Sequence, residues 1–255
     1  MKIGASTLYG ILSRTPLEAA SELKNYGIAA VEIMQEYRHD TISKSDSRKM
    51  RKLDLDYSVH LPFQELCFAH PNPEIRKACF KQVRKGLEIA AGIGAKECVM
   101  HGGKIPQDYL KVDGRWNRIS DFLDFFSVEF DNVMNEADYL GINVFLENMS
   151  QKEWLFGEYG DFEDMRIPDA GFCLDIPHSL RQGHLELYLK NKKIDHVHIS
   201  DSRPGYDDHC AVGNGKLPLK EAVEKLKQKG YDGKVIVECF TVRDTLKSVD
   251  RLREW

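Results

Sequence analysis

The sequence predicts an α/β protein, a single (β/α)8 or TIM barrel spanning residues 1–255. Short apolar runs alternate with amphipathic helical stretches along the chain, which favours parallel strands joined by helical crossovers. Eight such runs occur, and 255 residues is a usual length for a closed barrel. No G-x-G-x-x-G turn follows the first run, although a dinucleotide-binding open sheet would carry one there.

The predicted strands share a short length and an apolar interior. They are Lys2–Ser6, Ala29–Ile33, Tyr57–His60, Glu97–His101, Ile142–Glu147, Gly171–Asp175, Asp195–Ile199 and Lys234–Cys239. Between some of them, apolar residues recur at helical spacing. The helices predicted in this way are Pro16–Asn25, Pro73–Ala91, Ile119–Leu140 and Leu219–Lys229. Glycines that mark helix exits are Gly27, Gly94, Gly141, Gly183 and Gly230.

The composition excludes several classes of protein. Hydrophobic residues make up 42% of the chain and the formal charge is −4, which excludes disorder and gives no general drive toward nucleic acid. No apolar stretch is long enough to cross a membrane, and no secretory leader is recognisable, so we expect a cytoplasmic protein. The six cysteines form no C-x-x-C pair, which predicts reduced thiols packed in the core.

Polar side chains gather where the predicted strands end. The residues at or near these ends are Ser6, Glu32, His60, His101, Glu147, Asp175, His198 and Glu238. In a barrel, the carboxyl ends of the strands converge on one axis and form the active-site face. Crowded carboxylates repel one another unless a cation holds them, and imidazole with carboxylate suits Zn²⁺, Mn²⁺ or Fe²⁺. The sequence therefore predicts a divalent-metal centre at this face.

Loop residues extend the predicted centre. His178 follows the strand-end Asp175 by three residues, and Asp207 and His209 form a D-x-H pair in the loop after His198. His196 lies two residues before His198, so it is expected on the same side but deeper, as a buried, hydrogen-bonded residue. The remaining histidines, which have no supporting neighbours, are interpreted as surface or packing residues: His39, His70 and His184.

Taken together, these segments resemble the xylose-isomerase-like TIM barrels. That superfamily includes sugar and sugar-phosphate isomerases and epimerases, and the endonuclease IV type (family 2) of AP endonuclease. The resemblance covers nearly the whole chain. The motifs that carry it are Val59-His60-Leu61-Pro62, Val99-Met100-His101-Gly102-Gly103, Leu146-Glu147-Asn148, Cys173-Leu174-Asp175-Ile176-Pro177-His178, His198-Ile199-Ser200-Asp201, Asp207-Asp208-His209 with Gly213-Asn214-Gly215, and Val237-Glu238.

The two branches of the superfamily imply different metal centres. The isomerase and epimerase branch implies one divalent ion held by Glu147, Asp175, His198 and Glu238. The endonuclease branch implies up to three zinc ions, which would add the ligands His60, His101, His178, Asp207 and His209. Glu153 and Arg203 resemble substrate-binding positions of ketose epimerases.

The leading hypothesis is a metal-dependent isomerase or epimerase of a sugar, sugar phosphate or related polyol, with Zn, Mn, Mg or Fe as cofactor. Glu147 and Glu238 would move a proton through an enediolate, and His178 would bind a substrate oxygen. The loop Leu61–Leu66 carries Glu65 and no tyrosine, and the segment from His198 to His209 is short; both features favour the sugar branch. Three aromatic residues are candidates to cover the mouth of the site: Phe63, Trp154 and Phe156.

Two other hypotheses stay open. The first is a zinc phosphodiesterase that cleaves DNA at abasic sites, and it needs basic residues near the mouth. One basic cluster follows the second strand, although a solvated helix face explains it more simply: Lys44, Arg48, Lys49, Arg51 and Lys52. The second is a barrel that binds without catalysis, which the intact set of polar strand ends disfavours. The predicted binding partner is a small-molecule sugar or sugar phosphate. No membrane association is expected, and the question of a homo-oligomer stays open.

Overall fold

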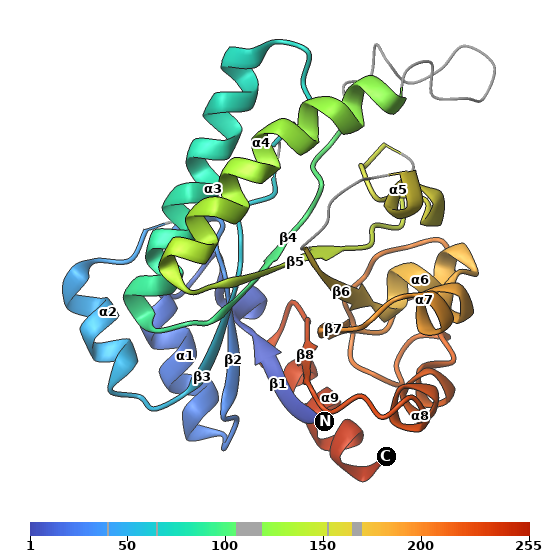
Figure 1. Cartoon of the computed structure of the whole chain (residues 1–255). Helices are drawn as coiled ribbons and strands as arrows, with labels where there is room; N and C mark the ends of the chain where they lie inside the picture. The colour runs from blue at the N-terminus through green and yellow to red at the C-terminus, as the bar shows by residue number, and fades with distance from the viewer. Residues whose placement is uncertain (40, 65, 106–118, 152, 165–169) are drawn as a thin grey trace.

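Eight parallel strands pair in the order of the chain, and β8 pairs with β1, so the sheet closes into a barrel (Figure 1). The computed structural model describes residues 1–255 except 40, 65, 106–118, 152 and 165–169. The prediction of a single (β/α)8 TIM barrel is confirmed. The strands are β1 Lys2–Ser6, β2 Ala30–Met34, β3 Asp56–His60, β4 Glu97–Met100, β5 Asn143–Glu147, β6 Gly171–Asp175, β7 His196–Ile199 and β8 Lys234–Val237.

The observed strands agree with the predicted ones within two residues at each end. Two differences matter for the site, because β4 ends at Met100 and β8 ends at Val237. His101 and Glu238 therefore lie directly after their strands. Glu238 is nevertheless held like a strand residue, since its N–H donates to the Ile199 carbonyl at 3.0 Å.

Helices surround the barrel, with α3 and α4 side by side along one flank and both chain termini close together (Figure 1). Among the described residues the helices are η1 Thr7–Gly10, α1 Pro16–Asn25, η2 Tyr37–His39, α2 Lys44–Arg51, α3 Pro73–Ile93, α4 Ile119–Leu140, α5 Tyr159–Asp164, α6 Ile176–Gln182, α7 Leu185–Asn191, α8 Leu219–Gln228 and α9 Val242–Glu254. The four predicted helices are confirmed. The sequence pattern did not predict α9, because two of its buried residues are the polar Thr245 and Ser248.

Local sequence sets where the predicted helices begin and end. Thr15 caps α1 through a reciprocal capping box with Glu18, and Pro16 occupies the first turn, where its missing N–H costs nothing. Helix α3 likewise starts at the Asn72 cap and ends at Gly94. Gly94 has φ +87°, a left-handed conformation that glycine adopts without a steric penalty.

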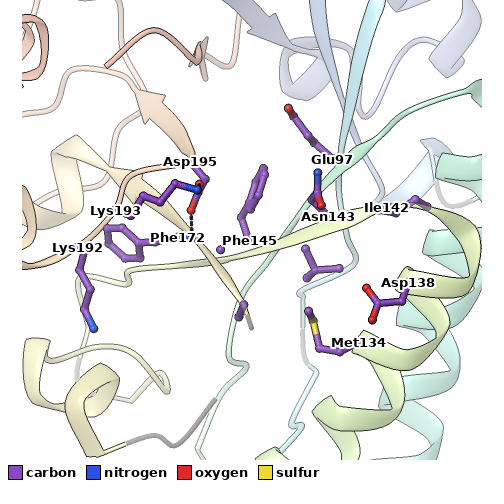
Figure 2. Close-up of a pocket in the computed structure, with 13 residues that line it drawn as sticks. Glu97, Met134, Asp138, Ile142, Asn143, Phe145, Phe172, Lys192, Lys193 and Asp195 are labelled. Carbon is purple, nitrogen blue, oxygen red and sulfur yellow. Dashed lines mark hydrogen bonds and ion pairs between the residues drawn. The ribbon is translucent and has the colours of Figure 1, made fainter. Parts of the chain in front are cut away.

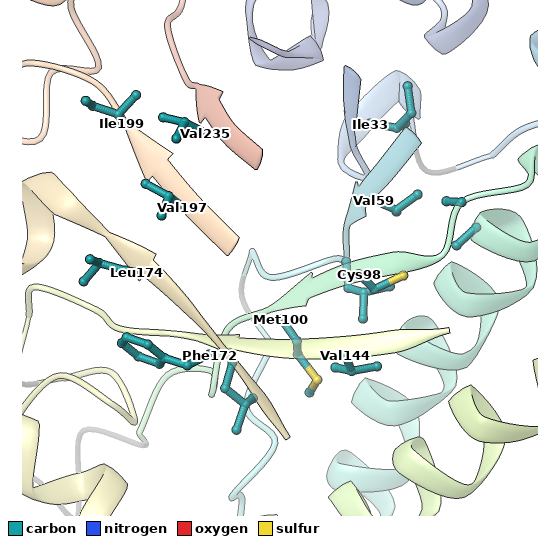
Figure 3. Close-up of a cluster of buried hydrophobic side chains, with 14 of the residues drawn as sticks. Ile33, Val59, Cys98, Met100, Val144, Phe172, Leu174, Val197, Ile199 and Val235 are labelled. Carbon is teal, nitrogen blue, oxygen red and sulfur yellow. The ribbon is translucent and has the colours of Figure 1, made fainter. Parts of the chain in front are cut away.

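The main core lies between the barrel and its helices (Figure 3). Strand residues that point outward, such as Val59, Met100 and Val144, pack there against the inner faces of the helices. Inside the barrel, Val99, Phe145 and Cys173 form a small apolar cluster. Polar side chains such as Glu32, Ser58 and His196 are buried in the interior as well.

Replacing Leu87 with alanine is expected to lower the free energy of unfolding by about 2–5 kcal/mol, because it leaves a cavity in this core. Leu87 on α3 is fully buried. The matched control is Leu187→Ala on α7, where the side chain is 41% exposed and the expected loss is below about 1 kcal/mol. Urea denaturation measures both values, and equal losses would contradict this account of the core.

The structure also bears on two predictions from composition. All six cysteines are free thiols, and Cys98, Cys173 and Cys239 are buried as predicted. Over the described ranges, no helix combines the length and the apolar character needed to cross a membrane.

Candidate metal centre

The carboxyl ends of the strands bring the predicted polar residues into one cluster. Glu147 lies at its centre, with its Oε2 atom 3.3 Å from Nε2 of His60 and 3.2 Å from Nε2 of His101. The two imidazole nitrogens are 3.1 Å apart. Two imidazoles and one carboxylate oxygen therefore converge on a single point, a donor set that suits a divalent metal ion.

A second group of donors shares Glu147. Nδ1 of His198 lies 3.2 Å from Glu147 Oε2 and 3.7 Å from Glu238 Oε1, so the two carboxylates approach the same ring nitrogen. Asp175 and His178 approach the other oxygen of Glu147: His178 Nδ1 lies 3.7 Å from Glu147 Oε1 and 3.4 Å from Asp175 Oδ1. All these side chains are buried.

A third group of donors lies nearer the solvent. Asp207 sits between two histidines, with His178 Nε2 3.2 Å from one carboxylate oxygen and His209 Nε2 3.6 Å from the other. Arg181 on α6 contacts the same carboxylate at 3.0 Å. The structure thus brings together all nine of the metal-ligating residue types predicted from the sequence.

Backbone groups orient several of these imidazoles. Nδ1 of His60 lies 2.9 Å from the Leu61 carbonyl oxygen. The corresponding distance is 2.8 Å from Nδ1 of His178 to the Asn148 carbonyl and 3.1 Å from Nδ1 of His209 to the Glu238 carbonyl. A carbonyl oxygen only accepts hydrogen bonds, so each of these Nδ1 atoms is a donor. Nε2 is consequently turned toward Glu147 in His60, and toward Asp207 in His178 and His209.

The segments around the site are cross-braced. The Asn148 side chain forms two hydrogen bonds with the backbone of Asp175, which locks the end of β5 to the end of β6. The carboxylate of Asp201 accepts hydrogen bonds from the backbone of Gly213 and Leu217. At Gly215 a Cβ atom would lie 2.1 Å from Asp201 Oδ1, so only glycine fits there. The Gly213-Asn214-Gly215 motif therefore shapes the loop that carries Asp207 and His209.

The cluster leaves buried polar atoms unpaired. Among the described residues, Glu147 Oε2, Glu238 Oε1 and both ring nitrogens of His198 are buried without a hydrogen bond of good geometry. Buried polar atoms normally have a partner, since an unpaired one costs about 1–3 kcal/mol. Carboxylate and imidazole donors in this arrangement fit a divalent cation, which would satisfy Glu147 Oε2, Glu238 Oε1 and Nδ1 of His198, whereas Nε2 of His198 faces Glu32.

The pKa shifts follow from burial and from the crowding of charges. Burial lowers the pKa of His101 to about 4, and Glu147 opposes the shift, so this ring is neutral at pH 7. Burial raises the pKa of Asp175 to about 6, with His178 opposing and Glu147 adding to the shift. Burial alone would lower the pKa of His178, but Asp175 and Asp207 raise it to about 9.

The metal-free protein is expected to lose stability as the pH rises from 6.5 to 9. His178 has a folded pKa of about 9 against an ordinary value of 6.5, so its contribution is complete below pH 6.5 and disappears as the pH passes 9. The loss from this group is up to about 3 kcal/mol. Urea denaturation in the presence of a chelator measures it, and His178→Gln should flatten the slope in part, because the pKa of His60 and of His198 is also raised. Constant or rising stability over this range would contradict the assignment.

A pocket of about 280 Å³ opens above the cluster. Seven of the predicted ligands form its floor, while Leu8, Met34 and Phe63 form an apolar wall. Trp154 and Phe240 also line it. The volume is near the lower end of the range of about 300–1,000 Å³ that small-molecule sites occupy. The pocket is therefore of a size for a small polar molecule with an apolar side.

A larger hollow of about 600 Å³ lies at the opposite rim of the barrel (Figure 2). It is lined by residues at the starts of strands, including Glu97 and Asn143, and by the Lys193–Asp195 ion pair. The two ends of a TIM barrel differ in role, since catalytic groups converge only at the carboxyl ends of the strands. The smaller pocket is accordingly the candidate active site.

Several other predicted residues lie away from the pocket lining. Glu153 is exposed, and the Arg203 side chain is 69% exposed and forms a bidentate ion pair with Asp208. Phe63 and Trp154 line the pocket as predicted, but the prediction for Phe156 is wrong. That ring is fully buried and packs against Phe126 and Phe162 in the core. Glu65 lies outside the described residues.

The basic cluster after β2 lies on α2 and its end, where its side chains are exposed. Lys49 pairs with Asp46, and Arg51 donates to the carbonyls of Ala91 and Gly92 at the end of α3. The interpretation as a solvated helix face is confirmed.

Sequence reasoning gave no role to three residues that the structure places beside the centre. Arg181 holds Asp207, and Asn148 braces Asp175. The position of Arg181 three residues after His178, on the same helix face, was a usable signal. Glu32 was noted as a strand-end residue, but it lies in the middle of β2, one layer below the centre. His196 is buried beside it, as predicted.

Fold and site together define a TIM barrel with a carboxylate–imidazole centre at the carboxyl ends of its strands. The chain belongs to the xylose isomerase-like TIM barrel family, whose sequence profile matches residues 20–255. Uncharacterized protein MJ1311 of Methanocaldococcus jannaschii is 28% identical over 269 aligned residues, which cover 100% of this chain and 89% of the relative. A probable endonuclease 4 of Mycobacterium leprae is 26% identical over 239 aligned residues, which cover 86% of this chain and 88% of the relative.

Similar solved structures include sugar epimerases. A D-tagatose 3-epimerase-like protein superposes with a TM-score of 0.87 at 26% identity, covering 100% of this chain and 96% of that protein. An L-ribulose 3-epimerase superposes with a TM-score of 0.75 at 15% identity, covering 99% and 86%. The second similarity shows the shared fold alone.

Proposed function

We propose that the protein is a divalent-metal-dependent isomerase or epimerase of a sugar, sugar phosphate or related polyol. The observation that carries this proposal is the approach of Glu147 and Glu238 to the same nitrogen of His198, Nδ1, at the floor of a pocket of about 280 Å³. Two carboxylates that flank one reacting carbon are suited to remove a proton from one face and return it to the other. The similarity to a D-tagatose 3-epimerase-like protein supports the same class of substrate.

Each residue has a role that its contacts permit. Glu147, Asp175, His198 and Glu238 would hold one Zn²⁺, Mn²⁺, Mg²⁺ or Fe²⁺ ion, which would polarise the substrate carbonyl and acidify the neighbouring C–H bond. Among these four, Glu147 and Glu238 both approach Nδ1 of His198, and Glu147 shares a donor group with Asp175 and His178. Glu147 would remove the proton and keep it, leaving an enediolate, and Glu238 in its protonated form would donate its own proton to the same carbon. His178 donates from Nδ1 to the Asn148 carbonyl, and because its pKa is raised to about 9 the protonated ring would also donate from Nε2 to a substrate oxygen.

Hydrogen exchange tests this proposal. The metal-loaded protein is incubated in deuterated water with a panel of ketoses and ketose phosphates, and deuterium incorporation at carbon is followed by NMR. We expect exchange with at least one free or phosphorylated ketose. Absence of exchange across the panel, from protein whose bound metal has been verified, would overturn the proposal.

A second candidate function is cleavage of DNA at abasic sites, and a specific observation favours it. The third donor group, formed by His178, Asp207 and His209, and the His60–His101–Glu147 group supply ligands beyond the four that a single ion needs. Clustered zinc ions activate hydroxide and stabilise the leaving oxygen of a phosphodiester. The similarity to a probable endonuclease 4 supports this candidate.

Duplex DNA with one abasic site separates the two candidates. If the zinc-loaded wild type cleaves the strand and the Glu238→Gln variant does not, the nuclease function replaces the isomerase proposal. Intact DNA together with deuterium exchange into a ketose would exclude the nuclease.

A further inference from the structure

Glu32 lies inside the barrel directly below the proposed metal centre. It comes from the middle of β2 and is completely buried. Its two oxygens face two histidines of β7: Oε1 lies 2.9 Å from Nε2 of His198, and Oε2 lies 3.0 Å from Nε2 of His196. Ser58, the residue paired with Glu32 on β3, donates to Oε2 at 2.8 Å. One carboxylate therefore contacts β3 beside it and β7 across the barrel.

His198 is oriented differently from three other histidines of the centre. In these three rings Nδ1 faces a backbone carbonyl, while Nε2 faces Glu147 in His60 and Asp207 in His178 and His209. In His198 the two nitrogens exchange places, because Nδ1 lies 3.2 Å from Glu147 Oε2 while Nε2 faces Glu32. Glu32 thus stands where a carbonyl stands for the others.

Glu32 places a hydrogen-bond acceptor 2.9 Å from Nε2 of His198. A neutral imidazole has one N–H donor and one lone pair, and an acceptor next to one nitrogen fixes the proton there. Metal-binding histidines commonly donate the other ring N–H to a carboxylate or a carbonyl, which orients the ring and strengthens it as a ligand. The 2.9 Å separation is of hydrogen-bond length, although the N–H direction is off the ideal line in this structure.

We propose that Glu32 is a positioning residue that keeps the proton of His198 on Nε2 and so turns the Nδ1 lone pair toward the metal ion. This inference rests on the metal-binding part of the proposed function and holds for either candidate substrate. The other interpretation of Glu32, His196 and His198 is a deeper ion site, since their ligand atoms lie within 4.8 Å of one another. The contact from Ser58 and the short distances to both rings favour positioning.

Glu97 provides a matched control, because it is a second glutamate that contacts His196. Its Oε2 atom lies 3.6 Å from Nδ1 of His196 and 2.9 Å from Nζ of Lys234. It also lines the hollow at the rim opposite the metal centre (Figure 2). Glu97→Gln makes the same chemical change as Glu32→Gln, but its histidine contact is with His196 and not with the ligand His198.

Zinc binding and histidine NMR test the proposal without an activity assay. The Kd for Zn²⁺ is measured by competition with a chromophoric chelator for the wild-type protein, Glu32→Gln and Glu97→Gln. We expect Glu32→Gln to weaken zinc binding about 10–100-fold, as loss of a partner of a metal ligand does. Glu97→Gln should stay within about threefold of the wild type, because it does not touch a ligand. In ¹H–¹⁵N spectra of the zinc-loaded wild type, His198 should show a protonated Nε2 and a metal-bound Nδ1.

Each outcome has a definite meaning. A folded Glu32→Gln variant with wild-type zinc affinity, or a wild-type spectrum in which Nε2 of His198 binds the metal, overturns the inference. The spectrum decides the matter even when Glu32→Gln does not fold. Loss of one equivalent of zinc with unchanged affinity for the rest shows a deeper ion site and also overturns it. Failure of the wild type to bind any of Zn²⁺, Mn²⁺, Mg²⁺ and Fe²⁺ overturns the metal-dependent function itself, which distinguishes the two failures.

Discussion

Replacing Glu238 with glutamine is expected to lower kcat for deuterium exchange by about 10²–10⁴-fold, the usual contribution of a general acid or base. The amide keeps the size of the side chain but cannot accept and return a proton at neutral pH. Glu238 lies 3.7 Å from Nδ1 of His198 and lines the pocket, so a substrate bound there would be within its reach. The measurement is made at saturating metal concentration, because the same substitution also weakens the metal site.

The control for this substitution is Glu221→Gln on the exposed face of α8, where Glu221 pairs with Lys225. Its kcat should stay within about twofold of the wild type, since surface substitutions away from special features have small effects. A Glu238→Gln variant that binds metal and keeps wild-type kcat would remove Glu238 from the proton transfer.

Removing the metal is expected to abolish activity, with a loss of at least about 10³-fold, because the polarised carbonyl is what makes the C–H bond acidic. Dialysis against a chelator followed by addition of Zn²⁺, Mn²⁺, Mg²⁺ or Fe²⁺ should restore it. The crowded carboxylates give the physical reason to expect tight binding: burial raises the pKa of Asp175 to about 6, with Glu147 adding to the shift. Full activity in verified metal-free protein would contradict the proposal.

The same titration reports the number of ions and their effect on stability. About one equivalent per chain favours the sugar branch, and about three favour the nuclease. Metal at 100 times its Kd should stabilise the fold by about 2.7 kcal/mol per independent site. The midpoint of thermal unfolding with and without metal measures this gain, and an unchanged midpoint would indicate that no ion binds the folded chain.

The sequence predicted the fold because its signals are local. The alternation of apolar runs with amphipathic helices, together with a cap such as Thr15 or a left-handed glycine such as Gly94, specifies elements that form by short-range contacts. Helix α9 was not predicted, because its buried face contains Thr245 and Ser248. Their hydroxyl groups donate to the backbone carbonyls of Thr241 and Asp244, respectively. A polar residue can be buried when its hydrogen-bond partner lies on the same helix, but it then interrupts the apolar spacing by which a helix is predicted.

The proposed site was predictable to a similar degree, since strand ends of a closed barrel must converge. This rule alone predicts that His60, His101 and Glu147 meet, and the ring nitrogens and carboxylate oxygen of these side chains lie within 3.3 Å of one another. The convergence of strand ends does not predict the position of Arg203, which lies in a loop and pairs with Asp208 at the surface. A loop residue has no strand to fix its direction, so its spacing from His198 carries little information.

The sequence by itself determined the barrel, its strand order and the set of side chains at its carboxyl end. Only the tertiary structure decided which atoms meet: that Glu32 contacts His198 across the barrel, and that Nδ1 of His198 faces the centre while Nδ1 of His60 faces a carbonyl. These contacts depend on how the strands are staggered around the closed sheet, which sets the depth of each inward residue. No local pattern encodes that stagger, because it arises from the pairing of all eight strands together.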